Sequence, residues 1–462
     1  MPRRERIVAV ITLCLLQVCT AGAGVAVIDL TPRHRVAPRP PAVAARTPVQ
    51  VTAPMPGTDP DAPVPSAAVL TERLAALADG PGPKIGAVVI DAETGRTLFD
   101  RDARRPATPA STTKLVTSVA ALSALGPDHR ITTRVVRGGT EEAVVLVGGG
   151  DPTLTARTPA YGAYPQYASL DDLARQTADA LKKAGVARIR VDYDTSLYEG
   201  GSTAEGWKPN YLPDGEVAPM SALTVDEGRT RLGEQTRVSD PAASAARTFA
   251  RMLDRHGVPA KAGRRTVAER AAPTLGAVQS PPVSALVEHL MTVSDNDVAE
   301  ALLRQVAVKR NRPASFEGGS QAVMAELARL GVAEGVRVND GSGLSTRNRI
   351  TPLALARIAS LAASGAHPEL RAAITGMPVA GFTGTLSAPR YTGPGTAAGA
   401  GVVRAKTGTL SGVSTLAGLV QDADGRLLAF AFMLGDGEGP VDRGRLDLLA
   451  AAVAACGCRT GP

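Results

Sequence analysis

The chain has 462 residues, 44% of them hydrophobic and 21% charged, which suits two or three globular domains and excludes a disordered chain. Its net charge of +7 is not gathered into a basic stripe with stacking aromatic residues, so no nucleic-acid partner is expected. Four cysteines, confined to the two ends, and five scattered histidines argue against a cysteine nucleophile and against a metal site.

The first residues read as an export segment. Three arginines precede an apolar run at residues 7–18, small residues at 20–23 suit signal cleavage, and the uncharged stretch continues to Ile28. That stretch is also long enough to cross a bilayer. Residues 1–30 are therefore predicted to be a cleaved signal peptide or a membrane anchor, and the remainder is expected in the extracytoplasmic cell envelope, either secreted or anchored to the membrane by this segment.

Residues 31–67 are rich in proline and alanine, which predicts an extended linker. The patterns that follow predict helices, in chain order, at residues 68–78, 111–126, 171–184, 283–303, 319–330, 351–363 and 441–455. Strands are predicted at residues 85–91, 96–100, 143–147, 188–193, 402–406, 414–422 and 426–434. Residues 194–280 carry many turn-forming residues and are predicted to be irregular.

The opening hairpin and the closing strands are expected to form one antiparallel sheet with helices against it. The catalytic domain is therefore predicted at residues 68–135 and 281–462. Residues 136–280 are predicted to be one or more inserted accessory domains. At the C-terminus, Cys456 and Cys458 form either a tight disulfide or two free thiols.

The sharpest chemical feature is Ser111-Thr112-Thr113-Lys114, the only S-x-x-K in the chain, at the start of a predicted helix. A serine hydroxyl is a weak nucleophile until a base lies beside it, and residues three apart on a helix share a face. Lys114 can therefore reach the Ser111 hydroxyl, while the helix N-terminus directs backbone N–H groups at a reacting carbonyl. Taken alone, such a pair is more often an exposed surface feature.

A second feature, Ser294-Asp295-Asn296, follows the apolar run that ends at Val293 and is the only S-x-N. The hydroxyl of Ser294 and the carboxamide of Asn296 suit proton relay and binding of a substrate amide. Asp295 is expected to face away from these roles. In isolation, the three residues would more often be a helix break or cap.

A third feature, Lys406-Thr407-Gly408-Thr409, ends a strand pattern. A lysine and two hydroxyls are what a substrate carboxylate requires, and the glycine permits close approach of the backbone. Alone, this would be an ordinary exposed strand end.

The order and spacing of the three motifs are those of penicillin-binding proteins and class A β-lactamases. Over roughly residues 70–455 the chain resembles the low-molecular-mass penicillin-binding proteins of the D-alanyl-D-alanine carboxypeptidase and endopeptidase type, the peptidase S13 family. Further segments that carry the resemblance lie at residues 148–154, 339–345 and 377–381. The resemblance implies an α+β fold of the serine β-lactamase and transpeptidase type, an antiparallel sheet flanked by helices, with a large inserted domain or domains.

The resemblance also implies catalytic roles. Ser111 would attack the carbonyl between two terminal D-alanines of a peptidoglycan stem peptide, and Lys114 would take its proton. Lys406 would help to hold Lys114 neutral by like-charge repulsion. Ser294 would pass the proton to the leaving amine. β-Lactam antibiotics would acylate the same serine as covalent inhibitors.

Substrate binding is implied for Asn296, which would hold the donor peptide amide, and for the strand Lys406, Thr407, Gly408 and Thr409. Thr407 and Thr409 would bind the terminal carboxylate, and backbone N–H groups would form the oxyanion hole. No metal or organic cofactor enters this mechanism.

Two other functions stay open at this point. The first is a β-lactamase or related serine esterase, although the chain has no E-x-x-L-N pattern to supply the carboxylate with which class A enzymes deacylate. The second is a non-catalytic peptidoglycan-binding or penicillin-sensing protein. The segment at residues 339–345 is either turn structure, which its glycines and aspartate favour, or part of the substrate cleft.

Overall fold

The computed structural model describes residues 61–457, apart from 80, 81, 159–161, 163, 232, 436 and 438. The predicted signal or anchor at 1–30, most of the linker at 31–67 and Cys458 lie outside this range. Cys456 is buried and disulfide-bonded. Among the described residues, no helix has the length and apolar character that a membrane crossing requires.

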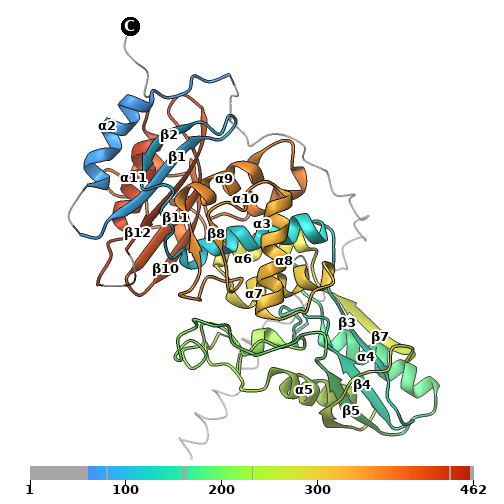
Figure 1. The fold of residues 1–462 in the computed structure, drawn as a ribbon. Coiled ribbons are helices and arrows are strands. Elements are labelled where there is room, and N and C mark those ends of the chain that lie inside the picture. The colour runs from blue at the N-terminus through green and yellow to red at the C-terminus, as the bar shows by residue number, and fades with distance from the viewer. Residues whose placement is uncertain are drawn as a thin grey trace, which may run out of the picture. The chain divides into compact units, whose positions relative to one another are not determined.

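The expected sheet from both ends of the chain is confirmed. Its order is β10-β11-β12-β1-β2, and every neighbouring pair is antiparallel. The bounds are β1 Ile85–Asp91, β2 Thr97–Arg101, β10 Val403–Leu410, β11 Val413–Gln421 and β12 Leu427–Leu434. The strand carrying the lysine motif, β10, is thus an edge strand beside the helices (Figure 1).

Helices cover both faces of this sheet (Figure 1). Because side chains alternate along a strand, Val89 and Phe430 face one core while Val88 and Ala431 face the other. The first core lies under the terminal helices α2 (Ala67–Ala78) and α11 (Gly444–Ala454), and the second under α9 (Pro352–Ala363) and the central helices. Two buried faces explain why the strands read as nearly continuous apolar runs.

The central helix α3 (Thr113–Leu125) is buried along almost its whole length, as a helix that is apolar on every side must be. It packs against α6, α7, α8, α9 and α10. The bounds of the helices not yet given are α6 Val283–Val293, α7 Asn296–Lys309, α8 Phe316–Arg329 and α10 Ala372–Thr375. A short helical turn, η1 (Ala110–Thr112), precedes α3 and carries Ser111.

The single helix predicted at residues 283–303 is wrong, because the structure has two helices there. The chain turns at Ser294, which has a left-handed backbone (φ +64°, ψ +40°). Asp295 then caps α7, its carboxylate accepting a hydrogen bond from the Val298 N–H. The break places Ser294 between the two helices, where its hydroxyl contacts Lys406, and Asn296 at the start of α7, where its side chain contacts Lys114 of α3.

The middle of the chain forms a second five-stranded sheet, in the order β6-β5-β4-β3-β7, with parallel and antiparallel pairs. Its strands are β3 Thr132–Arg137, β4 Ala143–Val147, β5 Ile189–Asp194, β6 Ala260–Arg265 and β7 Thr274–Gln279. Helices α4 (Leu170–Lys183) and α5 (Pro241–Arg255) pack on it. The prediction of irregular structure over residues 194–280 therefore missed α5, β6 and β7.

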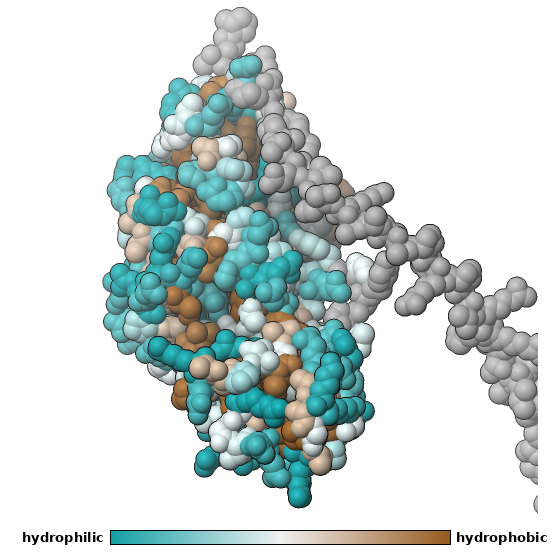
Figure 2. Space-filling model, turned by 90° about the vertical axis from the view of Figure 1, so that its right-hand side faces the viewer, coloured by the Kyte–Doolittle hydropathy of each residue, from teal (hydrophilic) through white to brown (hydrophobic). Residues whose placement is uncertain are grey.

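The described residues belong to one compact unit, so the division into a catalytic and an inserted domain stays a prediction. A two-stranded sheet, β8 (Val336–Arg337) with β9 (Arg349–Ile350), flanks the loop at residues 338–348. On the face drawn in Figure 2, hydrophilic side chains predominate and hydrophobic ones form small separate groups.

Candidate active site

Ser111 and Lys114 meet at the beginning of the buried helix α3. The Lys114 Nζ lies 3.0 Å from the Ser111 Oγ. Lys114 is fully buried, whereas Ser111 is only half-buried. The residue before the serine, Ala110, has an unusual positive φ of +47°, a strained conformation of the kind that concentrates at functional sites.

The Lys114 Nζ has two further neighbours, and both accept hydrogen bonds. The Asn296 Oδ1 lies 2.6 Å away and the Ser342 carbonyl oxygen 2.8 Å away. Burial lowers the pKa of Lys114 to about 8, although the surrounding carboxylates, Glu300 foremost, oppose this shift. A substantial fraction of the amine is therefore neutral near pH 8, as a general base requires.

Ser294 and Lys406 form a second pair. The Lys406 Nζ donates to the Ser294 Oγ at 2.9 Å and to the Thr407 carbonyl oxygen at 2.9 Å. Burial, and then the positive charge of Lys114, lower the pKa of Lys406 well below its usual value. Burial is the main reason that the pKa of Lys114 is lowered. The neutral state of Lys114 therefore depends more on desolvation than on the expected repulsion by Lys406.

The edge strand β10 passes directly beside the serine. A Cβ at Gly408 would lie 2.1 Å from the Thr415 hydroxyl and 3.0 Å from the Ser111 backbone nitrogen, so only glycine fits. The Thr407 hydroxyl lies 2.7 Å from the Thr385 hydroxyl, and Thr409 is exposed. The structure thus brings the three predicted motifs together around Ser111.

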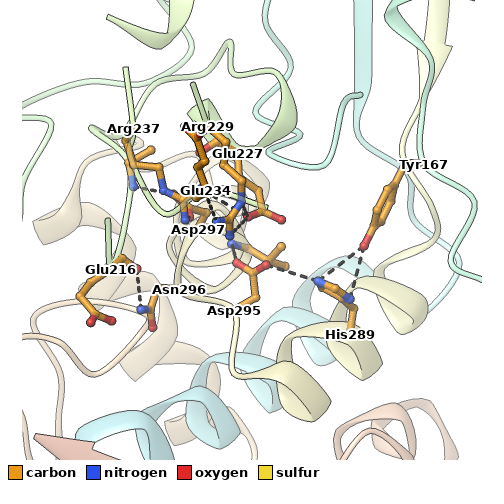
Figure 3. A network of polar contacts seen from close by, with 12 residues as sticks. Tyr167, Glu216, Glu227, Arg229, Glu234, Arg237, His289, Asp295, Asn296 and Asp297 are labelled. Atoms are coloured by element: carbon orange, nitrogen blue, oxygen red, sulfur yellow. Dashed lines mark hydrogen bonds and ion pairs between the residues drawn. The ribbon is translucent and has the colours of Figure 1, made fainter. Parts of the chain in front are cut away.

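The side chain of Asn296 has a fixed orientation. Its Nδ2 donates to the Glu216 carbonyl oxygen at 2.8 Å, which turns its Oδ1 toward Lys114. The next residue, Asp297, accepts from the Ala218 N–H at 2.8 Å and from Arg237 at 3.0 Å. The segment before α5 therefore holds the first turn of α7, as Figure 3 shows for most of these side chains.

Asp295 belongs to a polar network of its own (Figure 3). His289 Nε2 lies 3.3 Å from the Asp295 carboxylate, and the Tyr167 hydroxyl lies 3.3 Å from His289 Nδ1. Burial disfavours the charged imidazole, yet the hydrogen bond that His289 donates to the Asp295 carboxylate and the negative charges of Asp295 and Glu227 outweigh burial and raise the pKa of His289. The network connects α6, the start of α7 and the middle segment of the chain.

One trio in the described part of the chain has the spacing of metal ligands, with donor atoms within 4.8 Å of one another: Glu227, His289 and Asp295. Arg229 already forms hydrogen bonds of 2.8 and 3.1 Å to the Glu227 carboxylate. Arg229 therefore supplies a cationic partner for Glu227, and His289 supplies a hydrogen-bond partner for Asp295.

Sequence reasoning missed the groups that complete the surroundings of Lys114. Ser342 lies in the segment at residues 339–345, which the sequence predicts to be either turn structure or part of the substrate cleft. In the structure this segment is a tight loop, and its Ser342 carbonyl contacts Lys114. Glu300 is buried four residues after Asn296, on the same face of α7. A lone glutamate in an apolar helical stretch, one turn after a motif residue, is the signal that could have found it.

Comparison with known proteins gives one family and several relatives. The matching family model, described as D-Ala-D-Ala carboxypeptidase 3 (S13) family, covers residues 68–236 and 229–453. A carboxypeptidase DacB from Mycolicibacterium smegmatis is 39% identical over 411 residues, which are 87% of this chain and 87% of that protein. A D-alanyl-D-alanine carboxypeptidase from Actinomadura is 29% identical over 474 residues, covering 83% and 84% of the two chains.

Among solved structures, penicillin binding protein 4 (dacB) from Haemophilus influenzae superimposes with a TM-score of 0.66 at 23% identity. The match covers 83% of this chain and 97% of that one. At this level of identity the likeness shows a shared fold, and it confirms the predicted α+β architecture of the penicillin-binding type.

Proposed function

The chain belongs to the D-Ala-D-Ala carboxypeptidase 3 (S13) family and is a serine-type carboxypeptidase of that family, and we propose that Ser111 is its nucleophile. Its substrates are the D-alanyl-D-alanine ends of peptidoglycan stem peptides. The observation that carries the assignment is the 3.0 Å contact between the Ser111 hydroxyl and the buried amine of Lys114. The other fully buried lysine of the described residues, Lys406, contacts Ser294 at 2.9 Å, and we assign that pair to proton relay.

The remaining roles follow from the contacts of each group. Lys114 takes the proton of Ser111 as the oxygen attacks the carbonyl carbon. Ser294, hydrogen-bonded to Lys406, relays a proton to the leaving amine. The exposed Thr409 and the half-buried Thr407 lie where a terminal carboxylate would be bound, and the Ser111 N–H beside Gly408 supplies one donor of the oxyanion hole. Asn296 holds the donor peptide amide.

β-Lactam antibiotics acylate the enzyme. The penicillin binding protein 4 of Haemophilus influenzae has also been solved in complex with a β-lactam, and its fold is that of this chain. We propose that the adduct forms on Ser111 and deacylates slowly, because no carboxylate in an E-x-x-L-N pattern is present to activate water.

We further propose that the enzyme works outside the cytoplasmic membrane, carried there by residues 1–30 and spaced from the membrane by residues 31–67. The proposal is supported by the basic and apolar pattern of the first segment and by the location of peptidoglycan itself. We also propose that the catalytic body comprises residues 68–135 and 281–462, with 136–280 as an accessory insertion, a division supported by the separate five-stranded sheet in the middle of the chain.

A digest of purified muropeptides by the full-length protein tests the function. Loss of one terminal D-alanine from monomeric pentapeptides would show carboxypeptidase activity, and cutting of cross-linked dimers would show endopeptidase activity. A Ser111→Ala variant is the control and should yield neither product. If the wild type releases nothing, or if the variant is as active as the wild type, the assignment is wrong. Rapid turnover of a chromogenic cephalosporin would instead favour a β-lactamase.

A further inference from the structure

Glu300 is a buried carboxylate that the three motifs do not include. It lies in α7 with no measurable exposure to solvent. Its two oxygens accept one backbone N–H each, Oε2 from Gly341 and Oε1 from Ser342, both at 2.8 Å. Both oxygens act as acceptors, as those of an ionised carboxylate do. Burial and then the charge of Asp340 raise the pKa of Glu300 to about 8, and the hydrogen bonds from Gly341 and Ser342 oppose this shift by favouring the anion.

The loop that Glu300 holds is fixed from its other side by Asp340. The carboxylate of Asp340 accepts from the Gly343 N–H at 3.0 Å, from the Ser345 N–H at 2.6 Å and from the Asn348 Nδ2 at 2.6 Å. A Cβ at Gly343 would lie 1.9 Å from the Ala110 carbonyl oxygen, so the loop packs tightly against the turn that carries Ser111. Its carbonyl groups therefore have little freedom to reorient.

The hydrogen-bond partners of Lys114 determine where its lone pair points. A neutral amine has two N–H bonds and one lone pair. The Ser342 carbonyl oxygen can only accept a hydrogen bond. The Asn296 Nδ2 is bonded to the Glu216 carbonyl oxygen, so the atom of Asn296 that faces Lys114 is Oδ1, which also can only accept. The two N–H bonds of neutral Lys114 are thus used by these acceptors. The lone pair remains for the third neighbour, the hydroxyl of Ser111 at 3.0 Å.

We propose that Glu300 is a positioning residue for acylation: by holding the Gly341 and Ser342 N–H groups it fixes the Ser342 carbonyl, and so directs the lone pair of Lys114 at Ser111. This inference rests on the proposed function of Ser111 and Lys114. In the step itself the Ser111 O–H bond breaks, its proton forms a third N–H bond on Lys114, and the Oγ bonds to the carbonyl carbon while the π electron pair of that carbonyl moves to its oxygen. The pair then returns as the C–N bond breaks, and the leaving nitrogen takes a proton through Ser294.

The charge of Glu300 acts in the same step. As Lys114 gains the proton it becomes a cation in a buried site, and the carboxylate of Glu300 is the largest of the charges that favour this cation. The other charged groups that face Lys114 come from the loop, the start of α7, the middle segment and β10: Asp340, Asp295, Glu216 and Lys406.

The test compares full-length Glu300→Gln with the wild type. The second-order rate of acylation by a fluorescent penicillin is measured from pH 5 to 10, together with thermal unfolding. The glutamine keeps one acceptor but presents an NH₂ group to a backbone N–H, so the loop shifts. We expect the plateau rate to fall about 100-fold, as misplacement of a reacting group by about 1 Å does. The acid limb of the profile should also move to lower pH, because the anion that favours protonated Lys114 is gone.

Glu326→Gln is the matched control. Glu326 is also buried in a helix and hydrogen-bonded, to Ser123 at 2.7 Å and to two arginines, but it is not among the groups that act on Lys114. Its variant should lose stability without any shift of the acid limb. Glu300→Asp keeps the charge and shortens the reach, so its plateau rate should fall while the acid limb stays near that of the wild type.

The inference is overturned if Glu300→Gln keeps the wild-type plateau rate. It is also overturned if the acid limb of Glu300→Gln does not move and its rate falls only in proportion to its loss of stability, as expected for Glu326→Gln. It is also overturned if Glu300→Asp acylates at the wild-type rate. Failure of the proposed function has a different signature, since the wild type itself would then show no acylation that depends on Ser111.

Discussion

The Lys406 Nζ lies 2.9 Å from the Ser294 Oγ, although the two residues are 112 positions apart in the chain. Lys406 comes from the edge strand β10 and Ser294 from the break between α6 and α7, so the pair connects the sheet to the helices. Ser111 and Lys114 lie on the third element, the beginning of α3. The reactive groups of this enzyme therefore converge from three segments that only the folded chain brings together.

The hydroxyl of Ser294 should matter for chemistry and its backbone for stability. Ser294→Gly and Ser294→Ala both remove the hydroxyl, and we expect each to lower the acylation rate by about 100-fold or more, as loss of a proton-transfer group does. Only alanine keeps a Cβ at φ +64°, which costs roughly 1–2 kcal/mol in the left-handed region. Thermal unfolding should therefore show the alanine variant as the less stable. Equal acylation by the wild type and both variants would exclude the proton-relay role.

The pH dependence of acylation should follow the state of Lys114. Burial lowers the pKa of Lys114 to about 8, and its basic form is the neutral amine, so the rate should rise with pH and level off above about 8. Lys114→Arg keeps a cation that cannot lose its proton in this range, so the rate should fall roughly 100- to 10,000-fold. The exposed Lys309→Arg is the control and should behave as the wild type. A profile that falls from pH 6 to 8 would contradict the role of Lys114 as a base.

Gly408 should tolerate no side chain. Alanine there would place its Cβ 2.1 Å from the Thr415 hydroxyl and 3.0 Å from the Ser111 nitrogen, so β10 would have to move away from the serine. We expect an acylation rate about 100-fold lower and reduced thermal stability. Gly365→Ala, where a Cβ meets nothing within 4 Å, is the matched control and should leave both unchanged. Normal acylation by Gly408→Ala would show that this close approach is not required.

The hydroxyl of Thr407 should recognise the terminal carboxylate of the substrate. It is half-buried and shares a 2.7 Å contact with Thr385. Thr407→Val keeps the shape and removes the hydroxyl, so we expect the KM for a D-alanyl-D-alanine peptide to rise by about 10-fold, the effect of roughly 1.4 kcal/mol of lost binding. Kinetics with the same peptide ending in an amide provides the control. The wild type should reject the amide more strongly than the variant does, and equal discrimination would refute this role.

The sequence was sufficient to predict the helices and strands whose apolar residues recur at a clear helical or alternating spacing. The terminal strands, α3 and the three motifs could be predicted because apolar periodicity and residue type carry them directly. The segment at residues 194–280 was less clear. α5 has an Asp240 cap, a proline at its first position and a glycine after its end, signals that the many turn residues nearby obscured. β6 is mostly exposed and becomes a strand only by pairing with β5, so its own residues give little indication.

The surroundings of the site could not be predicted for a different reason. The backbone carbonyl of Ser342 contacts Lys114 directly. Glu216 acts through its carbonyl on Asn296, and Glu300 acts through the backbone N–H of Ser342. Contacts of this kind leave no pattern of residue types at a fixed spacing. A helix break at Ser294 is one interpretation of the Ser-Asp-Asn motif taken alone, but the apolar pattern continues on both sides of it into α6 and α7 and favoured a single helix. Such features depend on which segments meet in the fold.

The most direct measurement is mass spectrometry of the full-length protein after incubation with penicillin, followed by proteolysis and mapping of the modified peptide. We predict one penicilloyl group per chain, on the peptide that contains Ser111, persisting after free antibiotic is removed. The Ser111→Ala variant should carry none. An adduct on a different residue, or an unmodified chain under conditions in which the protein is folded, would contradict the assignment of Ser111 as the nucleophile.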